Sequence, residues 1–483
     1  MADKTDFYQR LNIQTGASDD AIRKAYRLAV KKAHPDVNKQ TGATEMFLGI
    51  QEAYQILSDP NKRQDYDQGR EPSQTPGAIH ITTQYSSESL YHYAEPQIAY
   101  CMIDFVTPEA AKDTANLPLN IALVLDTSTS MKGDRLDLLK SATKEIIEDL
   151  HEQDAVSIIS FNDRSRVLLP NQTHPPAVQV EASLNSLLAE GGTEIFQGLE
   201  AAFNQINTRI TDDHVNHIIL ITDGHTYGDE EKCFELARAA ANQEIGISSL
   251  GIGVEWNDEF IDELCGITGG TSMFIRKPPE VKEFLKKTIE TLKDSSARQV
   301  SLFLHPAPGV RTLSAFRILP ETFPLPHAEE YPLGTLKKDQ HQRVLFEFLI
   351  DEVPESIDQV IIANGEITVK RKPKDLSVPF VLEQSIAPAE DEITAPPEEI
   401  MRAIAHLMLY RLQEKAQKDI LAGEPENAYQ RLINLSSHLM AKGQQALAKV
   451  AMNEAEYIKS NHEFSPDGKK ELKYQTRNLM LPG

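Results

Sequence analysis

Cysteine is scarce in this chain, and the long apolar segments that membranes require are missing. Only three cysteines occur among 483 residues, Cys101, Cys233 and Cys265, and their spacing matches no metal-ligand pattern. Three cysteines cannot all form pairs, which favours a reducing compartment. No apolar run approaches the roughly 20 residues of a membrane span, and the charged start MADKTDFYQR lacks the apolar core of a secretory signal. We therefore expect a cytoplasmic protein without membrane contact.

Recognisable catalytic motifs are also missing. The pair Gly251-x-Gly253 lacks the third glycine of a dinucleotide-binding fingerprint, and the sequence contains no phosphate loop. Neither a Ser–His–Asp arrangement nor a pair of catalytic carboxylates is recognisable. His214, His217 and His225 are close in sequence, but their spacing is not that of metal ligands. We therefore expect that the protein is not an enzyme.

Acidic residues outnumber basic ones, and the excess of acidic residues lies outside the N-terminal region. The chain has 49 Lys and Arg against 72 Asp and Glu, a formal net charge of −23. Residues 1–70 hold 11 basic and 10 acidic residues, whereas the remainder holds 38 and 62. An acidic body repels the phosphates of nucleic acid, so we expect no nucleic-acid partner. Solubility alone explains most of the remaining excess.

The first seventy residues have the pattern of a small helical module. A helix predicted from about Asp19 to Ala33 carries a basic, solvent-facing stripe formed by Arg23, Lys24, Arg27 and Lys31. A second predicted helix has an apolar face formed by Phe47, Ile50, Tyr54 and Leu57, so the two helices can pack as an antiparallel hairpin. Between them lies His34-Pro35-Asp36. Because Pro35 disfavours helix at His34, the imidazole and the carboxylate are held in the turn.

This region resembles the J domain of DnaJ-type cochaperones over its full length. The resemblance lies in the runs DFYQRLNI, SDDAIRKAYRLAVKKAHPDVNK and IQEAYQILSDPNKRQDYD. It implies an all-α fold whose basic stripe contacts an acidic surface of a DnaK-type chaperone, while His34, Pro35 and Asp36 trigger ATP hydrolysis by that chaperone. It also implies the core positions Tyr8, Leu11, Tyr26, Ala53, Tyr54 and Leu57.

Two residues depart from the J-domain pattern. Ala33 stands where a tyrosine usually precedes the histidine, and Leu28 replaces a common basic residue. The Gly/Phe-rich segment and the cysteine-rich zinc repeats of full DnaJ proteins are absent from this sequence. The strength of chaperone stimulation therefore stays open, as does the alternative that the module is kept only as an interaction surface.

Residues 118–290 alternate apolar strands with amphipathic helices. The predicted strands are IALVLD (121–126), VSIISF (156–161), HIILIT (217–222), ISSLGIG (247–253) and SMFIR (272–276). Strands that are apolar on both faces and separated by helices indicate a parallel sheet covered on both sides. We therefore predict a doubly wound α/β domain, in which ligands bind at the carboxyl ends of the strands.

Oxygen-bearing side chains follow two of these strands and one loop. The first strand ends in Asp126-Thr127-Ser128-Thr129-Ser130, the third ends in Asp223-Gly224, and Gly191-Gly192-Thr193 forms a tight loop between them. Carboxylates and hydroxyls are ligands that suit a hard cation such as Mg²⁺. Asp-Gly is often an ordinary turn and Ser or Thr after a strand is often a helix cap, so the joint pattern carries the prediction. His225, next but one to Asp223, is a candidate for the rim of the site.

The order D-x-S-x-S, G-G-T and T-D-G resembles the metal-ion-dependent adhesion site of von Willebrand factor A domains. The resemblance covers about residues 118–290 and implies the metal-site residues Asp126, Ser128, Ser130, Thr193 and Asp223. It further implies that the serines contact a divalent metal, Mg²⁺ first among the candidates, and that the aspartates often act through water. The remaining position is usually filled by a carboxylate from a bound protein. A structural or empty site is the alternative.

Strand-like segments flank the α/β region on both sides, and helical ones follow. Because QIAYCMIDFV precedes it and VSLFLHP, VLFEFLI and VPFVLEQ follow it, we predict one β-sandwich with the A domain inserted. The C-terminal helices resemble at most one tetratricopeptide unit, and three packed helices are preferred. The predicted boundaries are a J domain at 1–70, a linker at 71–77, sandwich strands at 78–117, the A domain at 118–296, further sandwich strands at 297–386, an acidic linker at 387–398, a helical domain at 399–460 and a tail at 461–483 without assigned function.

These patterns predict a multidomain α/β protein that acts as a cochaperone. Its J domain is expected to recruit and stimulate a DnaK-type chaperone of the 70 kDa heat-shock class. Its A domain is expected to bind a protein carboxylate through the metal. The alternative is a metal-dependent protein-binding scaffold or assembly factor, with an AAA-type ATPase as a candidate partner. A metal-dependent hydrolase is disfavoured because no base or nucleophile accompanies the metal ligands. The client, the metal's occupancy and the oligomeric state stay open.

Overall fold

The chain forms two compact units, Met1–Ala78 and Ile79–Gly483. The computed structural model describes residues 79–479 apart from gaps at 93–94, 107–116, 225, 227, 254–255, 276–279, 338–339, 354–358, 371–374 and 388–395. In the N-terminal unit it describes residues 7–11, 13, 17, 22–26, 29, 53–54 and 57. No described helix is long and apolar enough to cross a membrane.

The described part of the N-terminal unit is a small apolar cluster that begins at α1 (Phe7–Arg10). Its buried members are Tyr8, Leu11, Ile22, Ala53 and Leu57. The rings of Tyr26 and Tyr54 stack against this cluster with their centroids 3.9 Å apart. The apolar faces of the two predicted helices therefore meet, and the core positions implied by the J-domain resemblance are confirmed.

The A domain is built on a six-stranded sheet with the order β6-β5-β4-β7-β8-β9. Its bounds are β4 (Leu119–Asp126), β5 (Ala155–Phe161), β6 (Ser165–Thr173), β7 (Val215–Thr222), β8 (Ile245–Ile252) and β9 (Ser272–Ile275). All neighbouring strands pair in parallel except β6, which pairs antiparallel to β5 at the edge. The doubly wound parallel sheet is confirmed. The edge strand β6 was not predicted, because its residues are only partly buried and show no apolar run.

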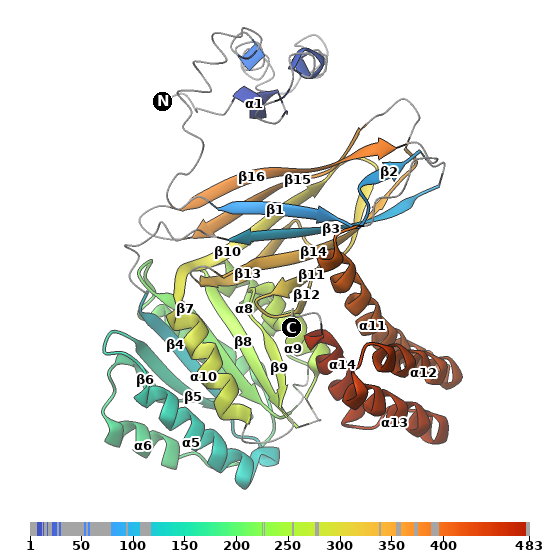
Figure 1. The fold of residues 1–483 in the computed structure, drawn as a ribbon. Helices are drawn as coiled ribbons and strands as arrows, with labels where there is room; N and C mark the ends of the chain where they lie inside the picture. The colour runs from blue at the N-terminus through green and yellow to red at the C-terminus, as the bar shows by residue number, and fades with distance from the viewer. Residues whose placement is uncertain are drawn as a thin grey trace. The chain divides into compact units, whose positions relative to one another are not determined.

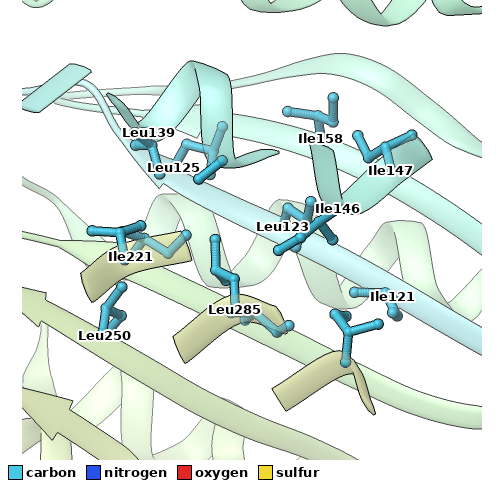
Figure 2. Packing of buried hydrophobic residues seen from close by; sticks show 14 of the residues in the cluster. Ile121, Leu123, Leu125, Leu139, Ile146, Ile147, Ile158, Ile221, Leu250 and Leu285 are labelled. Atoms are coloured by element: carbon cyan, nitrogen blue, oxygen red, sulfur yellow. The ribbon is translucent and has the colours of Figure 1, made fainter. Parts of the chain in front are cut away.

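Helices cover both faces of this sheet, as Figure 1 shows. One face is covered by α5 (Asp134–Glu148), α6 (Ala177–Asn185) and α10 (Glu280–Lys293), and the other by α7 (Ile195–Asn207), α8 (Glu230–Asn242) and α9 (Asp258–Ile267). Along β4, Leu123 packs into the first core, which Figure 2 shows together with Ile146 and Leu285, whereas Val124 packs into the second. Each such side chain contributes about 1.5–3 kcal/mol by burial, which explains why the central strands are apolar throughout.

The remaining strands form a β-sandwich that the A domain interrupts. One sheet has the order β1-β3-β14-β11-β12 and the other β13-β10-β15-β16-β2. The strands are β1 (His80–Tyr85), β2 (Ser89–Tyr91), β3 (Gln97–Val106), β10 (Ser295–Pro306), β11 (Val310–Leu319), β12 (Phe323–Leu325), β13 (Glu330–Lys337), β14 (Gln342–Ile350), β15 (Gln359–Lys370) and β16 (Leu376–Ala387). Strands from before and after the A domain pair directly, as β3 does with β14. The predicted insertion is confirmed.

Arg317 of β11 links the β-sandwich to the A domain through hydrogen bonds. Its guanidinium is buried and donates hydrogen bonds to the carbonyl oxygens of Gly269, Gly270 and Leu333. Gly269 and Gly334 both have positive φ, and a Cβ on Gly269 would lie 2.3 Å from the backbone nitrogen of Gly334. Only glycine permits this approach, so the two backbones are in direct contact.

The C-terminal region has four helices where three and a tail were predicted. They are α11 (Glu398–Leu421), α12 (Pro425–Ala441), α13 (Gln445–Asn461) and α14 (Gly468–Asn478). The predicted break at Gly423-Glu424-Pro425 separates α11 from α12. The tail predicted at 461–483 is corrected, because its central residues form α14. This helix escaped prediction because its buried face contains Lys470, Lys473 and Arg477, which do not register in an apolar pattern.

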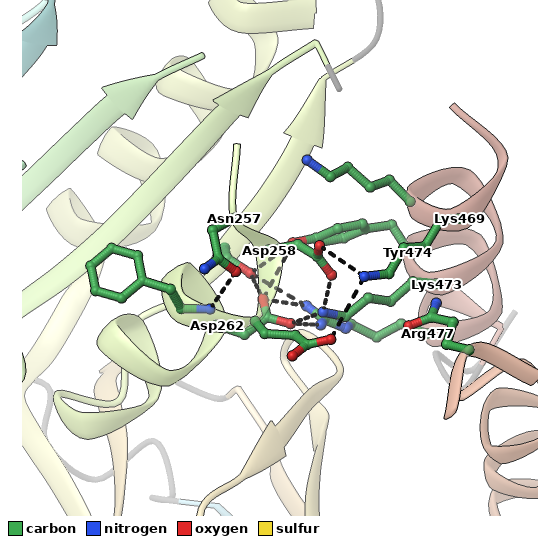
Figure 3. Close-up of polar contacts among 12 residues, drawn as sticks. Asn257, Asp258, Asp262, Lys469, Lys473, Tyr474 and Arg477 are labelled. Carbon is green, nitrogen blue, oxygen red and sulfur yellow. Dashed lines mark hydrogen bonds and ion pairs between the residues drawn. The ribbon is translucent and has the colours of Figure 1, made fainter. Parts of the chain in front are cut away.

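An ion-pair network joins α14 to α9 of the A domain (Figure 3). Lys473 Nζ lies 2.5 Å from Asp258 Oδ2 and 2.8 Å from Asp262 Oδ2, and Arg477 Nη2 lies 2.5 Å from Asp262 Oδ2. The Tyr474 hydroxyl donates to Asp262 Oδ1 at 3.3 Å. Burial alone would raise the pKa of Asp262, but the charges of Arg477 and Lys473 outweigh it and hold that pKa well below its usual range.

We expect acid to weaken this network. An unfolded aspartate has a pKa of about 3.9, and the depressed pKa of Asp262 means that its contribution is present above that value and lost as the pH falls below it. The difference in free energy of unfolding between the wild type and Asp262→Asn should therefore narrow by about 1.4 kcal/mol per pH unit below about pH 4. Urea titrations at neutral and acid pH measure this difference. A difference that does not change with pH would contradict the prediction.

Candidate metal centre

Four of the five predicted metal-site residues lie at the carboxyl ends of the neighbouring parallel strands β4 and β7. Asp126 is the last residue of β4, and Asp223 directly follows β7, which ends at Thr222. Ser128 and Ser130 lie in the turn after β4, where the short 3₁₀ helix η1 spans Thr129–Met131. Asp126, Ser128 and Asp223 are buried, whereas Ser130 is exposed at the rim. The strand order thus brings together residues almost a hundred positions apart.

The oxygen atoms of these side chains converge. Ser130 Oγ donates a hydrogen bond to Asp223 Oδ1 at 2.6 Å, and Ser128 Oγ lies 3.0 Å from Ser130 Oγ and 3.5 Å from Asp223 Oδ1. Oxygen ligands that are adjacent around Mg²⁺ lie about 3 Å apart, because each metal–oxygen bond measures about 2.1 Å and the angle between bonds is near 90°. The two serine hydroxyls and the Asp223 carboxylate therefore have the spacing of neighbouring ligands of a small hard cation.

Asp126 lies beneath this group and is held by its own hydrogen bonds. Its Oδ1 accepts the backbone N–H of Ser128 at 2.7 Å, and its Oδ2 accepts the hydroxyl of Thr222 at 2.6 Å. Burial, helped by the charge of Asp223, outweighs these hydrogen bonds and raises the pKa of Asp126 to about 6. Two buried carboxylates so close together favour a bound cation, which stabilises both in the charged form.

Thr193, the fifth predicted residue, approaches the backbone at Gly224 and forms no hydrogen bond with the other four. The loop that carries it is held by Thr129, whose backbone N–H and hydroxyl both donate to Gly191 O, at 3.2 and 2.9 Å. Thr193 Oγ1 lies 2.7 Å from the place that a Cβ on Gly224 would take, so the hydroxyl approaches the backbone next to Asp223. A side chain larger than that of glycine at position 224 would displace Thr193.

Arg135 is a residue of this site that was not predicted from the sequence. Its Nη1 donates to Asp223 Oδ2 at 2.6 Å and to Ser130 O at 3.4 Å, and its side chain is 41% exposed. The positive charge of the guanidinium thus partly balances the negative charge of Asp223. The sequence places Arg135 in the first turn of α5, five residues after Ser130. In that position it has the pattern of an ordinary solvent-exposed helix residue.

The donor set fits a hard divalent cation better than a transition metal. The described residues contain no cluster of three or more His, Cys, Asp or Glu side chains that could hold a metal ion. The oxygens at this site belong to two carboxylates and to hydroxyls, which is the chemistry that Mg²⁺ accepts. If the cation binds, Asp126, Ser128, Ser130 and Asp223 are the residues with which it would interact.

The remaining predicted site residues are only partly described. Arg23 and Lys24 of the basic stripe are exposed, whereas Arg27, Lys31 and the His34-Pro35-Asp36 loop lie outside the described residues. His225, the candidate for the metal-site rim, also lies outside them.

His214 and His217, the other two histidines noted in the sequence, do not join the metal site. His217 is buried on β7, where its Nε2 lies 3.0 Å from Ser248 Oγ, and burial lowers its pKa to about 4. His214 Nδ1 lies 2.6 Å from the hydroxyl of Thr211 at the surface. All three cysteines are buried and unpaired.

Family models match three separate parts of the chain. Residues 6–67 match the DnaJ domain, residues 120–287 match the von Willebrand factor type A domain, and residues 398–482 match the Sll0103-like, C-terminal alpha-helical domain. The third match includes α14, so this helix belongs to the C-terminal domain and is not a tail.

Two of the similar proteins differ in how much of the chain they share. The uncharacterized protein sll0103 of Synechocystis sp. is 26% identical over 394 residues, which cover 78% of this chain and 92% of that protein. The chaperone protein DnaJ of Enterococcus faecalis is 50% identical over 82 residues, which cover 16% of this chain and 21% of the chaperone. The chain thus spans about a fifth of the length of that chaperone.

Solved structures share the fold at low sequence identity. A von Willebrand factor type A protein from Catenulispora acidiphila has a TM-score of 0.67 at 14% identity, over 84% of this chain and 98% of that one. The ArnB paralog VWA2 from Sulfolobus acidocaldarius has a TM-score of 0.51 at 15% identity, over 83% and 98%. These alignments reach well beyond the A domain, so the surrounding architecture is shared as well.

Proposed function

We propose that this fusion of a DnaJ domain with a von Willebrand factor type A domain is a cochaperone that brings a DnaK-type chaperone to a protein bound by the A domain. The N-terminal unit supports the first half, because it has 50% identity to a DnaJ chaperone over 82 residues. Its His34-Pro35-Asp36 loop and basic stripe are the residues proposed to act on the chaperone. The described stripe residues, Arg23 and Lys24, are exposed and so accessible to an acidic surface.

The second half of the proposal is metal-dependent binding of a protein carboxylate. The observation that carries it is the convergence of Ser128 Oγ, Ser130 Oγ and Asp223 Oδ1 within 2.6–3.5 Å above a buried Asp126. A divalent cation, which we propose to be Mg²⁺, would supply an electrophilic centre for an incoming oxygen ligand. It would balance the two carboxylates, and Arg135 would leave the loaded site positive, which attracts a carboxylate.

We propose that the A domain binds without catalysing a reaction, and that the protein acts in the cytoplasm. Asp126 and Asp223 are both in the proposed ligand set, so neither is available as a separate general base. The cytoplasmic assignment follows from the proposed partner, which consumes ATP, and from three unpaired cysteines. Mg²⁺-stimulated turnover of a substrate by the purified chain would contradict the first of these statements.

Affinity purification with the full chain tests metal-dependent capture. We expect Asp126→Ala to abolish the capture of proteins that wild type retains in Mg²⁺ and releases in EDTA. Mg²⁺ affinity should fall by at least about tenfold, because even partners of metal ligands contribute that much. Ser130→Ala removes a hydroxyl at the exposed rim without disturbing the hydrogen bonds of Asp126, and should act in the same direction.

Asp137→Ala is the matched control, because this aspartate is exposed on α5 and outside the converging oxygens. It should leave both capture and Mg²⁺ affinity unchanged. Capture by both Asp126→Ala and Ser130→Ala at the wild-type level would refute metal-dependent binding. The same preparations, assayed for stimulation of a purified DnaK-type ATPase, test the chaperone half of the proposal independently.

A further inference from the structure

Trp256 lies where the C-terminal helix α14 meets the A domain. Its ring is almost fully buried, and Lys470 Nζ of α14 lies 4.3 Å from the ring centroid while donating a hydrogen bond to the Trp256 carbonyl. The Tyr474 ring of the same helix lies 5.9 Å away, between centroids. Trp256 precedes α9, whose residues Asp258 and Asp262 hold α14 by ion pairs (Figure 3). Two side chains of α14 therefore lie directly against Trp256.

Trp256 in turn packs against the carboxyl end of β8 (Ile245–Ile252). Its indole Nε1 donates to Gly253 O at 2.9 Å, and its ring occupies the space beside Gly251, where a Cβ would lie 1.9 Å from a ring atom. Gly253 has a φ of +75°, and a Cβ there would lie 3.2 Å from Arg135 Nη2. Gly253 thus lies close to the guanidinium whose other terminal nitrogen binds Asp223 at 2.6 Å. Lys470, Trp256, Gly253 and Arg135 are thus a series of neighbouring residues that leads to Asp223.

We propose that docking of α14 restrains the metal site, so that the C-terminal helix regulates cation and partner binding by the A domain. This inference rests on the proposed metal-dependent function. With α14 docked, Gly253 supports Arg135 in the position where its positive charge neutralises Asp223. A cation that uses Asp223 competes with that charge. Release of α14 frees Trp256 and Gly253, removes the support behind Arg135 and makes Asp223 available.

The interface of α14 suits a reversible contact. Ion pairs make up much of it, and buried ion pairs gain little net free energy because removing the charges from water costs nearly as much as their attraction supplies. Binding free energy supplied elsewhere, such as that of a partner of the C-terminal domain, can therefore shift the docking equilibrium. Coupling between two sites is reciprocal. Cation binding must therefore reduce the docking equilibrium constant of α14 by the same factor by which docked α14 reduces the affinity for the cation.

The chain provides its own probe, because Trp256 is its only tryptophan. The experiment measures Mg²⁺ dissociation constants by calorimetry and Trp256 emission on the full chain, first stripped of metal with a chelator. We expect Lys470→Met to tighten Mg²⁺ binding by about fivefold or more, the lower end of typical couplings between sites. In the wild type, saturating Mg²⁺ should shift the emission of Trp256 to longer wavelength. Asp126→Ala should show no such shift.

Two further variants isolate the pathway. Gln475→Ala alters the exposed face of α14 and should leave the Mg²⁺ affinity at the wild-type value. Arg135→Gln removes the competing charge and should tighten Mg²⁺ binding by itself, and adding Lys470→Met to it should produce no further change. An undiminished effect of Lys470→Met in that background would overturn the pathway through Arg135.

The outcomes separate this inference from the function on which it rests. Wild type that binds Mg²⁺, together with Lys470→Met that binds it within twofold of the same affinity, would overturn the coupling and leave metal binding intact. Wild type that binds no Mg²⁺ would overturn both. Tighter binding in Lys470→Met, lost when Arg135 is also replaced, supports the inference.

Discussion

Substitution of Arg477 by methionine is expected to lower the free energy of unfolding by about 3–5 kcal/mol, the usual cost of removing one member of a buried ion pair. Arg477 is 2% exposed and its guanidinium binds Asp262, which is itself 8% exposed. Methionine preserves most of the apolar volume but supplies no charge. Asp262 would keep Lys473 as its cationic partner. The loss of stability therefore comes from the polar atoms that Arg477 contacts, which would stay buried without their hydrogen-bond donor. Urea unfolding followed by the emission of Trp256 measures the change.

Arg402→Met provides the control for Arg477→Met. Arg402 forms an exposed ion pair with Glu398 at 3.4 Å on α11. Such pairs contribute about 0.3–0.5 kcal/mol, so the control should be close to wild type. Arg477→Lys retains the charge and should recover part of the stability. A loss with Arg477→Met no larger than that with Arg402→Met would show that α14 is not held by this network.

Substitution of His34 by glutamine is expected to reduce the ATPase rate of a DnaK-type chaperone to its basal value in the presence of this protein. The amide retains hydrogen-bonding capacity, but it lacks the imidazole ring and cannot become cationic. Because the N-terminal unit folds around its own cluster of Tyr8, Leu11, Ile22, Ala53 and Leu57, the change should not unfold the A domain. Steady-state ATP hydrolysis at several concentrations of the chain measures the effect.

His151→Gln is the matched control for this experiment, since His151 is exposed and follows α5 in the A domain. It should stimulate the chaperone as wild type does. Both histidine variants should retain wild-type Mg²⁺ affinity. Full stimulation by His34→Gln would refute the chaperone half of the proposed function, whatever the A domain binds.

The sequence alone determined features whose physical cause is periodic or local. Strands such as IALVLD are apolar on both faces because helices cover both sides of the sheet, and this pattern predicted the doubly wound domain. Asp126, Ser128 and Asp223 follow strand ends, and parallel strands present those ends at one edge, so their convergence was predictable. The J-domain core was likewise predictable from Tyr26, Tyr54 and Leu57 at helical spacing.

Only the tertiary structure decided the contacts that are made by ion pairs between charged side chains and not by packing of apolar ones. In α14, Lys473 and Arg477 are buried because α9 supplies Asp258 and Asp262 from more than two hundred residues away, and no local pattern records that complementarity. Arg135 looks like a solvated helix residue until β7 places Asp223 beside it. The His34-Pro35-Asp36 motif was predictable because its three residues are consecutive in the sequence. The residues proposed to control the metal site were not, because a charged side chain acquires its role from the partner that folding brings to it.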